Sequence, residues 1–245
     1  MRSPLLLLGL AAILAMLHAP AALAQEISLS MGDDASLSAR TIQIIALITV
    51  LSLAPGIAIM VTCFPFIVTV LSILRQGIGL QQSPPNMLIV SLALFLTYFV
   101  MEPVFTEAWT NGIEPLLEER LSPERATEMV IAPFRQFMLG RVDPETFASM
   151  AALRPEASVT VAGSDAPLSV LIPSFMLSEI ARAFQIGFLV FLPFLVIDLV
   201  VAAILMSMGM MMVPPAIVSL PFKLAFFVIA DGWTLIAESL VKGYM

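Results

Sequence analysis

Histidine and cysteine are almost absent from this chain of 245 residues, which holds one of each, His18 and Cys63. His18 falls in a leader that we expect to be removed. The mature chain then lacks the residues for a Ser-His-Asp or Cys-His catalytic arrangement and for a Cys/His zinc site. Cys63 lies in an apolar run, and we interpret it as a small buried hydrophobic residue. The sequence therefore predicts a protein that is not an enzyme and needs no metal or cofactor.

Charged residues are also scarce, at 12% of the chain, whereas 60% of the residues are hydrophobic. The mean hydropathy of +1.01 is typical of membrane proteins and far from that of a soluble domain. The formal net charge is −7, and no basic patch interrupts the acidic balance. This charge pattern excludes nucleic acid as a partner.

Residues 1–24 have the pattern of a cleaved signal peptide. Arg2 precedes an apolar run from Leu5 to Leu17, and Ala22-Leu23-Ala24 supplies the small residues of a cleavage site. The alternative is an uncleaved anchor helix, but the run is short for a membrane span and Pro20 follows it. Cleavage removes Arg2 and changes the formal charge from −7 to −7 − 1 = −8.

The distribution of charge divides the rest of the chain into four parts. Residues 25–40 form a short extracytoplasmic segment, and residues 41–105 form a first apolar helical hairpin. Residues 106–170 form an acidic periplasmic helical domain, and residues 171–245 form a C-terminal apolar hairpin with a methionine-rich loop. We therefore expect an all-α fold of integral membrane helical hairpins with an extracytoplasmic helical domain.

Local signals refine this division. No charged residue lies between Arg40 and Arg75, a run too long for one span, so we expect a broken or tilted helix or two apolar pieces. Arg75 would occupy a short cytoplasmic loop, in agreement with the positive-inside rule. In the acidic part, Ser122-Pro123-Glu124 and Asp143-Pro144-Glu145 each place a capping side chain, a proline and an acid at a helix start.

Two opposite charges, Asp198 and Lys223, lie within the last apolar segments, where an unpaired charge is costly. Their midpoint, 210.5, falls in the methionine-rich turn, so an antiparallel hairpin would place both at the same height. We predict that they pair, within one hairpin or between adjacent copies. The alternative is an ion or proton relay, which could also recruit Glu102, Glu179 and Asp231. Glu179 has a local partner, however, because Arg182 follows three residues later.

The turn between these segments is rich in methionine and ends in two adjacent prolines, Pro214 and Pro215. The prolines remove two backbone donors and favour a hairpin turn, and Gly209 gives the loop freedom to move. Methionine is unbranched and adaptable, so the cluster predicts either a pore-facing gate or plain packing of a core gap. The candidate gate residues are Met206, Met208, Met210, Met211 and Met212.

Two ordered stretches carry a resemblance to a known family. The first is Ile172-Pro173-Ser174-Phe175-Met176-Leu177-Ser178-Glu179-Ile180, continued by Ala183-Phe184-Gln185-Ile186-Gly187-Phe188, and the second runs from Pro221-Phe222-Lys223-Leu224 to Asp231-Gly232-Trp233. On these residues the chain resembles the FliP family, the core export-gate protein of flagellar type III secretion. The motif residues are Pro173, Glu179, Phe184, Gln185, Gly187, Pro214, Pro215, Pro221, Asp231, Gly232 and Trp233. One departure is Cys63-Phe64-Pro65-Phe66, where the family commonly has a Ser-Phe-Thr-Arg-like sequence with a basic residue.

The resemblance implies a homo-oligomer within a hetero-oligomeric export gate, built with FliQ-like, FliR-like, FlhB-like and FlhA-like proteins. It implies a location in the bacterial inner membrane, in the flagellar basal body, with a periplasmic domain. Unfolded export substrates would pass a central pore that the methionine-rich loop closes. An injectisome export-gate paralogue is the near alternative. A small-solute or ion transporter that uses Asp198 and Lys223 is the alternative from another class.

Overall fold

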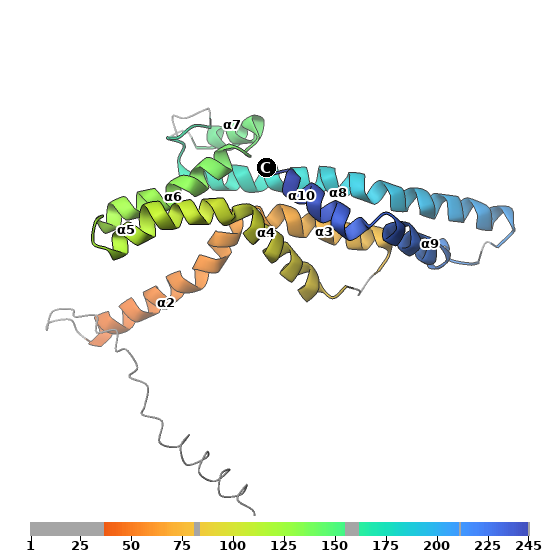
Figure 1. The fold of residues 1–245 in the computed structure, drawn as a ribbon, viewed down its shortest axis with the longest axis horizontal. Coiled ribbons are helices and arrows are strands. Elements are labelled where there is room, and N and C mark those ends of the chain that lie inside the picture. Colours follow the sequence, from red (N-terminus) through yellow and green to blue (C-terminus); the bar gives the residue numbers. More distant parts are fainter. Residues whose placement is uncertain (1–36, 81–83, 155–161, 211, 245) are drawn as a thin grey trace, which may run out of the picture. The chain divides into compact units, whose positions relative to one another are not determined.

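The structure is a computed structural model that describes residues 37–80, 84–154, 162–210 and 212–244. Throughout these residues every regular element is a helix, which confirms the all-α prediction (Figure 1). The predicted signal peptide, residues 1–24, lies outside the described residues, as does Met211.

The first described helix, α2, spans Leu37–Met60 and keeps Pro55 inside it. The chain forms two compact units, Met1–Val50 and Leu51–Met245, and every helix after α2 belongs to the second. From Arg40 to Met60 each described side chain is exposed. The other described residues do not cover the apolar surface of this helix, as expected of a helix that faces a membrane or a partner.

A turn over residues 61–63 separates α2 from α3, Phe64–Ile78. The long uncharged run thus forms two apolar pieces. Pro65 lies in the first turn of α3. Backbone N–H groups in a first turn have no acceptor within the helix, so the missing N–H of proline costs no hydrogen bond there. The helix ends at Gly79, whose φ of 90° is the left-handed conformation that favours glycine at a helix C-terminus. The departure from the family pattern therefore lies at a helix start.

The next helix, α4, spans Asn86–Ala108 and runs past residue 105 into the acidic part. It continues through one turn of π-helix, Trp109–Ile113, and a short helix α5, Glu114–Leu117. Gly112 lies in this π turn against a later helix, since a Cβ added there would be 2.5 Å from Val130 Cγ2. The acidic part is therefore continuous with the apolar helix that precedes it.

Both predicted helix starts in the acidic part are confirmed. Helix α6, Pro123–Leu139, begins after Ser122, whose hydroxyl accepts from the N–H of Arg125. Helix α7, Pro144–Ala152, begins after Asp143, whose carboxylate accepts from the N–H of Thr146 at 2.8 Å. The N–H and hydroxyl of Thr146 lower the pKa of Asp143, so the cap stays ionised.

The longest helix, α8, spans the 40 residues Leu168–Ser207 and keeps Pro173 and Pro193 inside it. Helix α9, Pro215–Ile229, turns back along it (Figure 1). A 61° bend separates α9 from α10, Gly232–Lys242. At this bend a Cβ on residue 232 would lie 2.2 Å from the Phe227 ring, so the motif glycine is required by the close approach.

Two hydrophobic cores hold the second unit together. The larger one packs α3 against the middle of α8, and there a Cβ on Gly187 would lie 2.4 Å from Ile73 Cδ1. The smaller one packs α7 and the end of α6 against the start of α8. Its buried residues are Met138, Val142, Phe147, Ala151, Ala166, Val170, Leu171 and Phe175. The helices of the acidic part therefore pack against α8 and do not form a separate core.

Three helical stretches in the described residues are long and apolar enough to cross a membrane: Arg40–Met60, Asn86–Leu117 and Leu168–Ser207. The bent pair α9 and α10 makes a fourth if it counts as one span. The largest apolar side chains on these stretches are mostly exposed within the chain. The chain is a membrane protein by these features.

Candidate functional site

The two charges in the last apolar segments lie together. Lys223 Nζ is 2.6 Å from Asp198 Oδ2, between α9 and α8 of one chain. Nζ also donates to the carbonyl of Gly77 at 3.1 Å, and the hydroxyl of Ser219 donates to Asp198 Oδ1 at 2.5 Å. The side chain of Lys223 is 6% exposed, whereas that of Asp198 is 37% exposed. The ammonium is satisfied inside the fold, and the carboxylate keeps one open side.

A second carboxylate, Glu179 on α8, is fully buried and has more partners than the sequence indicates. Its predicted partner Arg182 lies 2.9 Å away, and Arg141 lies 3.2 Å from the same oxygen, Oε1. The hydroxyl of Tyr244 donates to the other oxygen, Oε2. Two guanidinium groups and a phenol therefore compensate one buried charge, as the cost of burying an ion requires.

The residues around Glu179 also bind one another. Arg141 lies 4.0 Å from the centroid of the Tyr244 ring and donates to the carbonyl of Gly243 at 2.8 Å. Burial raises the pKa of Tyr244, and the Glu179 carboxylate raises it further, so the phenol stays protonated and able to donate. This Glu179 network, defined as Glu179, Arg141, Arg182 and Tyr244, ties the end of the chain and the α6–α7 turn to α8.

The methionine-rich turn begins where α8 ends. Met208 follows the last helical residue, and Gly209 has a φ of 74°. The N–H of Met210 donates to the carbonyl of Leu205 at 2.9 Å, and the N–H of Gly209 donates to that of Met206 at 3.1 Å. These two bonds form a Schellman motif, which places a left-handed residue, usually glycine, directly after the helix. The predicted prolines follow, with Pro214 before α9 and Pro215 as its first residue.

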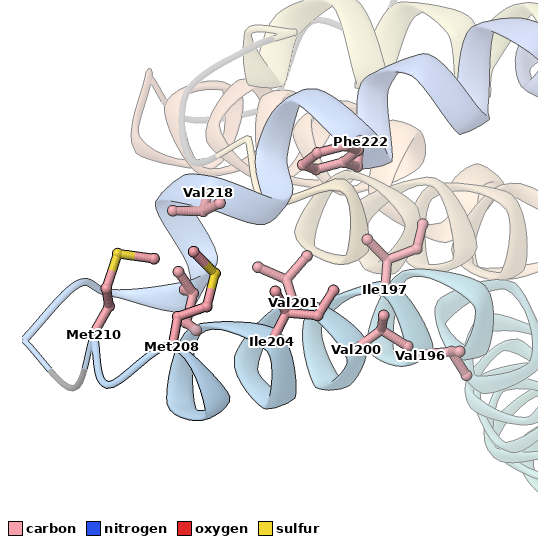
Figure 2. A pocket seen from close by; sticks show the side chains of 10 residues that line it. Val196, Ile197, Val200, Val201, Ile204, Met208, Met210, Val218 and Phe222 are labelled. Carbon is pink, nitrogen blue, oxygen red and sulfur yellow. The ribbon is translucent and has the colours of Figure 1, made fainter.

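An apolar pocket of about 510 Å³ lies between the end of α8 and the start of α9. Figure 2 shows Met208 and Met210 at its loop end, with Val218 and Phe222 on α9 across from the side chains of α8. All lining residues are apolar. They are Val196, Ile197, Val200, Val201, Ile204, Leu205, Met208, Met210, Val218 and Phe222.

The described candidate gate residues differ in exposure. Met206 and Met208 are 62% and 64% exposed, Met210 is 37% exposed, and Met212 is 97% exposed. Met212 does not line the pocket. The methionines therefore do not form one packed cluster, and at least Met212 projects away from the hairpin.

The family-motif residues fall into four groups. Gly187 and Gly232 are buried where another side chain approaches the backbone closely. Glu179 is the centre of the Glu179 network. Asp231 has a φ of 47° at the bend, accepts from the Thr234 hydroxyl at 3.1 Å, and precedes Trp233, whose ring meets Phe227 edge to face. The remaining motif residues are half-buried or exposed, on the helices or at the hairpin turn. They are Pro173, which is half-buried, and the exposed Phe184, Gln185, Pro214, Pro215 and Pro221.

Sequence reasoning missed Ser219, Arg141 and Tyr244 as partners of the two carboxylates. Ser219 precedes Lys223 by four residues, so the helical period alone could have found it. Arg141 and Tyr244 are 38 and 65 residues from Glu179, and no local signal indicates their contact.

The three acids that an ion or proton relay could recruit have different environments. Glu102 is exposed on α4, Asp231 directly precedes α10, and Glu179 is enclosed by Arg141 and Arg182. Over the part of the chain that the structure describes, no three His, Cys, Asp or Glu side chains group in a way that could hold a metal ion.

Comparison with known proteins gives one consistent result. A family model described as the FliP family matches residues 47–240. A protein of Caulobacter vibrioides named "Flagellar biosynthetic protein FliP" is 52% identical over 236 residues, which cover 96% of this chain and 88% of that protein. Proteins of the same name from Bacillus subtilis and Aquifex aeolicus are 42% and 45% identical. They cover 89% and 83% of this chain, and 98% and 86% of their own lengths.

Proposed function

The chain belongs to the FliP family, and from this premise we propose that it is a pore-forming core subunit of the flagellar type III protein export gate. In this role it passes unfolded flagellar substrates across the cytoplasmic membrane, and its methionine-rich loop is the gate. The relatives carry the flagellar name, which favours the flagellar system over an injectisome.

The observation that carries this proposal is the methionine turn at the tip of the α8–α9 hairpin. Met206, Met208 and Met212 are more than half exposed there, although large apolar side chains on a turn gain nothing from contact with water. Repeated around a ring of copies, such side chains would make an apolar constriction that excludes ions. Because a thioether side chain is flexible, the same ring can deform around varied substrate side chains.

The exposed apolar faces of the helices support an assembled state. On α8 alone, Phe184, Phe188 and Leu199 are each about 60% exposed, and patches of this kind mark contacts with a partner or with lipid. We assign these faces to a homo-oligomer inside a larger complex with FliQ-like, FliR-like, FlhB-like and FlhA-like proteins. The complex lies in the inner membrane, at the flagellar basal body, with the acidic helices on the periplasmic side.

The contacts of the charge pair favour this role over a transporter. A relay needs a group that gains and loses protons along a path, whereas Lys223 is held by Asp198 and the Gly77 carbonyl. We therefore assign the pair a structural role in the hairpin.

Native mass spectrometry tests the assembly. The tagged full-length chain would be co-expressed with its genomic neighbours and extracted in mild detergent. We expect one large particle with several copies of this chain and smaller helical partners. A stable monomer or homodimer without partners would contradict the proposal and favour the transporter.

A deletion of residues 210–212 tests the gate. In cells that carry the assembled apparatus, the deletion should make the membrane leak small ions while the complex still forms. The matched control is a deletion of residues 163–165, of which Ser164 and Asp165 are exposed, and it should leave ion retention unchanged. A deletion of 210–212 that assembles and does not leak would exclude the loop as the gate.

A further inference from the structure

The carboxylate of Asp198 on α8 keeps one side open. Its Oδ1 accepts from the Ser219 hydroxyl and its Oδ2 accepts from Lys223, yet 37% of the side chain is exposed. The residues beside it on α8, Ile197 and Leu199, are apolar. A charge on such a surface is costly wherever lipid or another apolar surface covers it, because no water completes its hydrogen bonds. The open side therefore fits a donor that the described chain does not supply.

Lys223 fixes the level at which this open side lies. Besides binding Asp198, its Nζ donates to the carbonyl of Gly77 at 3.1 Å, and a Cβ at Gly79 would lie 3.8 Å from the same Nζ. Both glycines lie at the C-terminal end of α3, where the last carbonyls of the helix attract a cation. Asp198 is therefore level with the end of α3, although it belongs to α8.

One cation at this end of α3 has no anion. Arg75, in the last turn of the helix, donates to Asn86 Oδ1 and, at 3.4 Å, to the Pro84 carbonyl. Both acceptors are neutral. Among the described residues Arg75 forms no ion pair, whereas Arg141 and Arg182 share the Glu179 carboxylate. The guanidinium of Arg75 is thus hydrogen-bonded without a compensating charge.

Arg75 and Asp198 belong to two different surfaces of the chain. Helix α3 packs against both α4 and α8. Arg75 reaches the start of α4, whereas Asp198 reaches α9 in the other hairpin. When two different surfaces of identical copies meet, the contact is head to tail, and it closes into a ring if the rotation between copies allows it. A donor and an acceptor at one level on separate surfaces fit that arrangement.

Two other cations of the second unit form no ion pair with a described residue, but they lie at another level. Arg135 donates to the carbonyl of Ala166, just before α8, and Arg154 follows α7, which packs on the start of α8. Asp198 is 30 residues beyond the first residue of α8, Leu168, which corresponds to about 45 Å along the helix. Arg75 is therefore the cation of this unit that fits the open side of Asp198.

We propose that the Arg75 guanidinium of one copy binds the open side of Asp198 in the next copy, so that an ion pair joins adjacent copies of this chain. This contact rests on the proposed function, in which several copies share one particle. An ionised carboxylate accepts at about four lone-pair sites, and the contacts with Ser219 and Lys223 leave the remaining sites for the neighbour. The same contacts hold the carboxylate in one orientation before the copies meet, which lowers the cost of association.

Substitutions of Arg75 test the contact without breaking an ion pair within the chain. Arg75→Gln keeps a donor for Asn86 and removes the charge, and Arg75→Lys keeps the charge. The readout is the rate at which the purified full-length complex, co-expressed with its genomic neighbours, loses copies in native mass spectrometry at fixed detergent and salt. We expect Arg75→Gln to raise this rate about ten-fold or more, and Arg75→Lys to raise it less. Arg40→Gln, the matched control, removes an exposed charge in the other compact unit and should leave the rate unchanged.

A double-mutant cycle shows whether the two residues meet between copies or within one. Arg75→Gln and Asp198→Asn each remove one charge of the pair. The double variant should lose copies about ten-fold or more slowly than the product of the single effects predicts. In unfolding of the purified single chain the same two changes should combine without coupling. Coupling in the unfolding measurement would place the contact inside one copy and contradict the proposal.

The charge swap of Asp198 and Lys223 gives a second readout. The swap keeps an ion pair within the chain but turns a cation toward Arg75 of the next copy. Arg75→Glu added to the swap restores opposite charges between the copies, so the triple variant should lose copies several-fold more slowly than the swap alone. An equal or faster loss in the triple variant would count against the contact.

Cross-linking keeps both charges in place and decides the case in which Asp198→Asn prevents assembly. Gln76 and Leu199 are the exposed neighbours of Arg75 and Asp198, and the native cysteine is buried. Two differently tagged copies, one with Gln76→Cys and one with Leu199→Cys, should be joined by a short bis-maleimide. The control moves the second cysteine to the exposed Phe184, about 22 Å back along α8, and this pair should not be joined.

These results separate the contact from the function on which it rests. A wild-type chain that yields no particle with several copies overturns the proposed function. A particle with several copies in which Arg75→Gln has no effect, or in which the cross-link fails, overturns the contact alone. If Arg75→Gln acts only when anionic lipid is present and does not couple to Asp198→Asn, Arg75 binds a lipid headgroup and the contact is again wrong.

Discussion

The two halves of α8 have opposite surroundings, and the more apolar half, which follows Gly187, is the less buried one. Up to Gly187 the helix has eight buried residues, packed on α3, α7 and the end of the chain, whereas beyond Gly187 it has three, Phe194, Val201 and Leu205. Each half carries one carboxylate. Glu179 in the first half is fully buried, and Asp198 in the second is 37% exposed. An apolar sequence therefore does not by itself decide which part of a helix forms the interior of a protein.

This difference shows that the first half of α8 belongs to the packed interior of the chain, as a structural anchor, whereas the second half is mostly surface. The first half is fixed by partners within the chain, so substitutions there should act on the folding of a single copy. The second half presents apolar side chains outward, so substitutions there should act on contacts with a membrane or with other chains. The predictions below test this contrast by comparing similar changes in the two halves.

The largest expected effect is that of Glu179→Ala. Removal of the carboxylate leaves Arg141 and Arg182 close together without their shared anion, so the free energy of unfolding should fall by about 3–5 kcal/mol. Glu179→Gln keeps the size and an acceptor and should cost less. Chemical unfolding of the purified chain in mild detergent measures both. A loss within about 0.5 kcal/mol, as at ordinary surface positions, would contradict the anchor role.

The second prediction concerns the charge pair of the exposed half. Asp198→Ala leaves Lys223 buried with only the Gly77 carbonyl and should cost about 3 kcal/mol, the lower end of the range for breaking a buried ion pair, because Asp198 itself is 37% exposed within the chain. Lys223→Ala leaves the Asp198 carboxylate with only the Ser219 hydroxyl and should also destabilise the chain, because an unpaired charge in an apolar segment is costly. The charge swap of both residues should restore part of the loss of assembled complex. A swap as damaging as either single change would show that the two charges do not act as a pair.

The third prediction sharpens the role of the chain end. Tyr244→Phe removes the hydroxyl that donates to Glu179 but keeps the ring that stacks on Phe137 and meets Phe66 edge to face. A hydrogen bond to a charged group contributes about 1.5–3 kcal/mol, and we expect a loss near the lower end because the two arginines remain. Unfolding of the purified chain measures the loss. Tyr98→Phe, on exposed α4, is the control and should change little.

The smallest effects come from one substitution made in both halves. Val170 is 2% exposed and Val200 is 53% exposed. Val170→Ala should cost about 1.5–2 kcal/mol, since each buried methylene contributes roughly 0.8 kcal/mol. Val200→Ala should stay within about 0.5 kcal/mol for the single chain. Equal losses in a detergent-solubilised monomer would remove the distinction between the halves.

Local and periodic features were predictable from the sequence. The caps at Ser122 and Asp143 involve neighbours three residues away, and the sequence alone therefore identifies them. The pairing of Asp198 with Lys223 follows from hairpin symmetry about the methionine turn, because two antiparallel helices rise equally from their connection. The family resemblance rests on the same kind of ordered, local pattern.

Other features depended on the tertiary structure because their partners lie far apart in the chain. The local order of residues identified an all-α membrane protein with a methionine turn and two intramembrane charges, since hydropathy and helical period are properties of neighbouring residues. Only the packing of α3, α7 and the chain end on α8 decided that Glu179 is enclosed by Arg141 and Tyr244. The same packing decided that Met210 lines the α8–α9 pocket whereas Met212, 97% exposed, does not. The physical reason is that burial depends on which surfaces meet, and a sequence pattern specifies an apolar face without specifying what covers it.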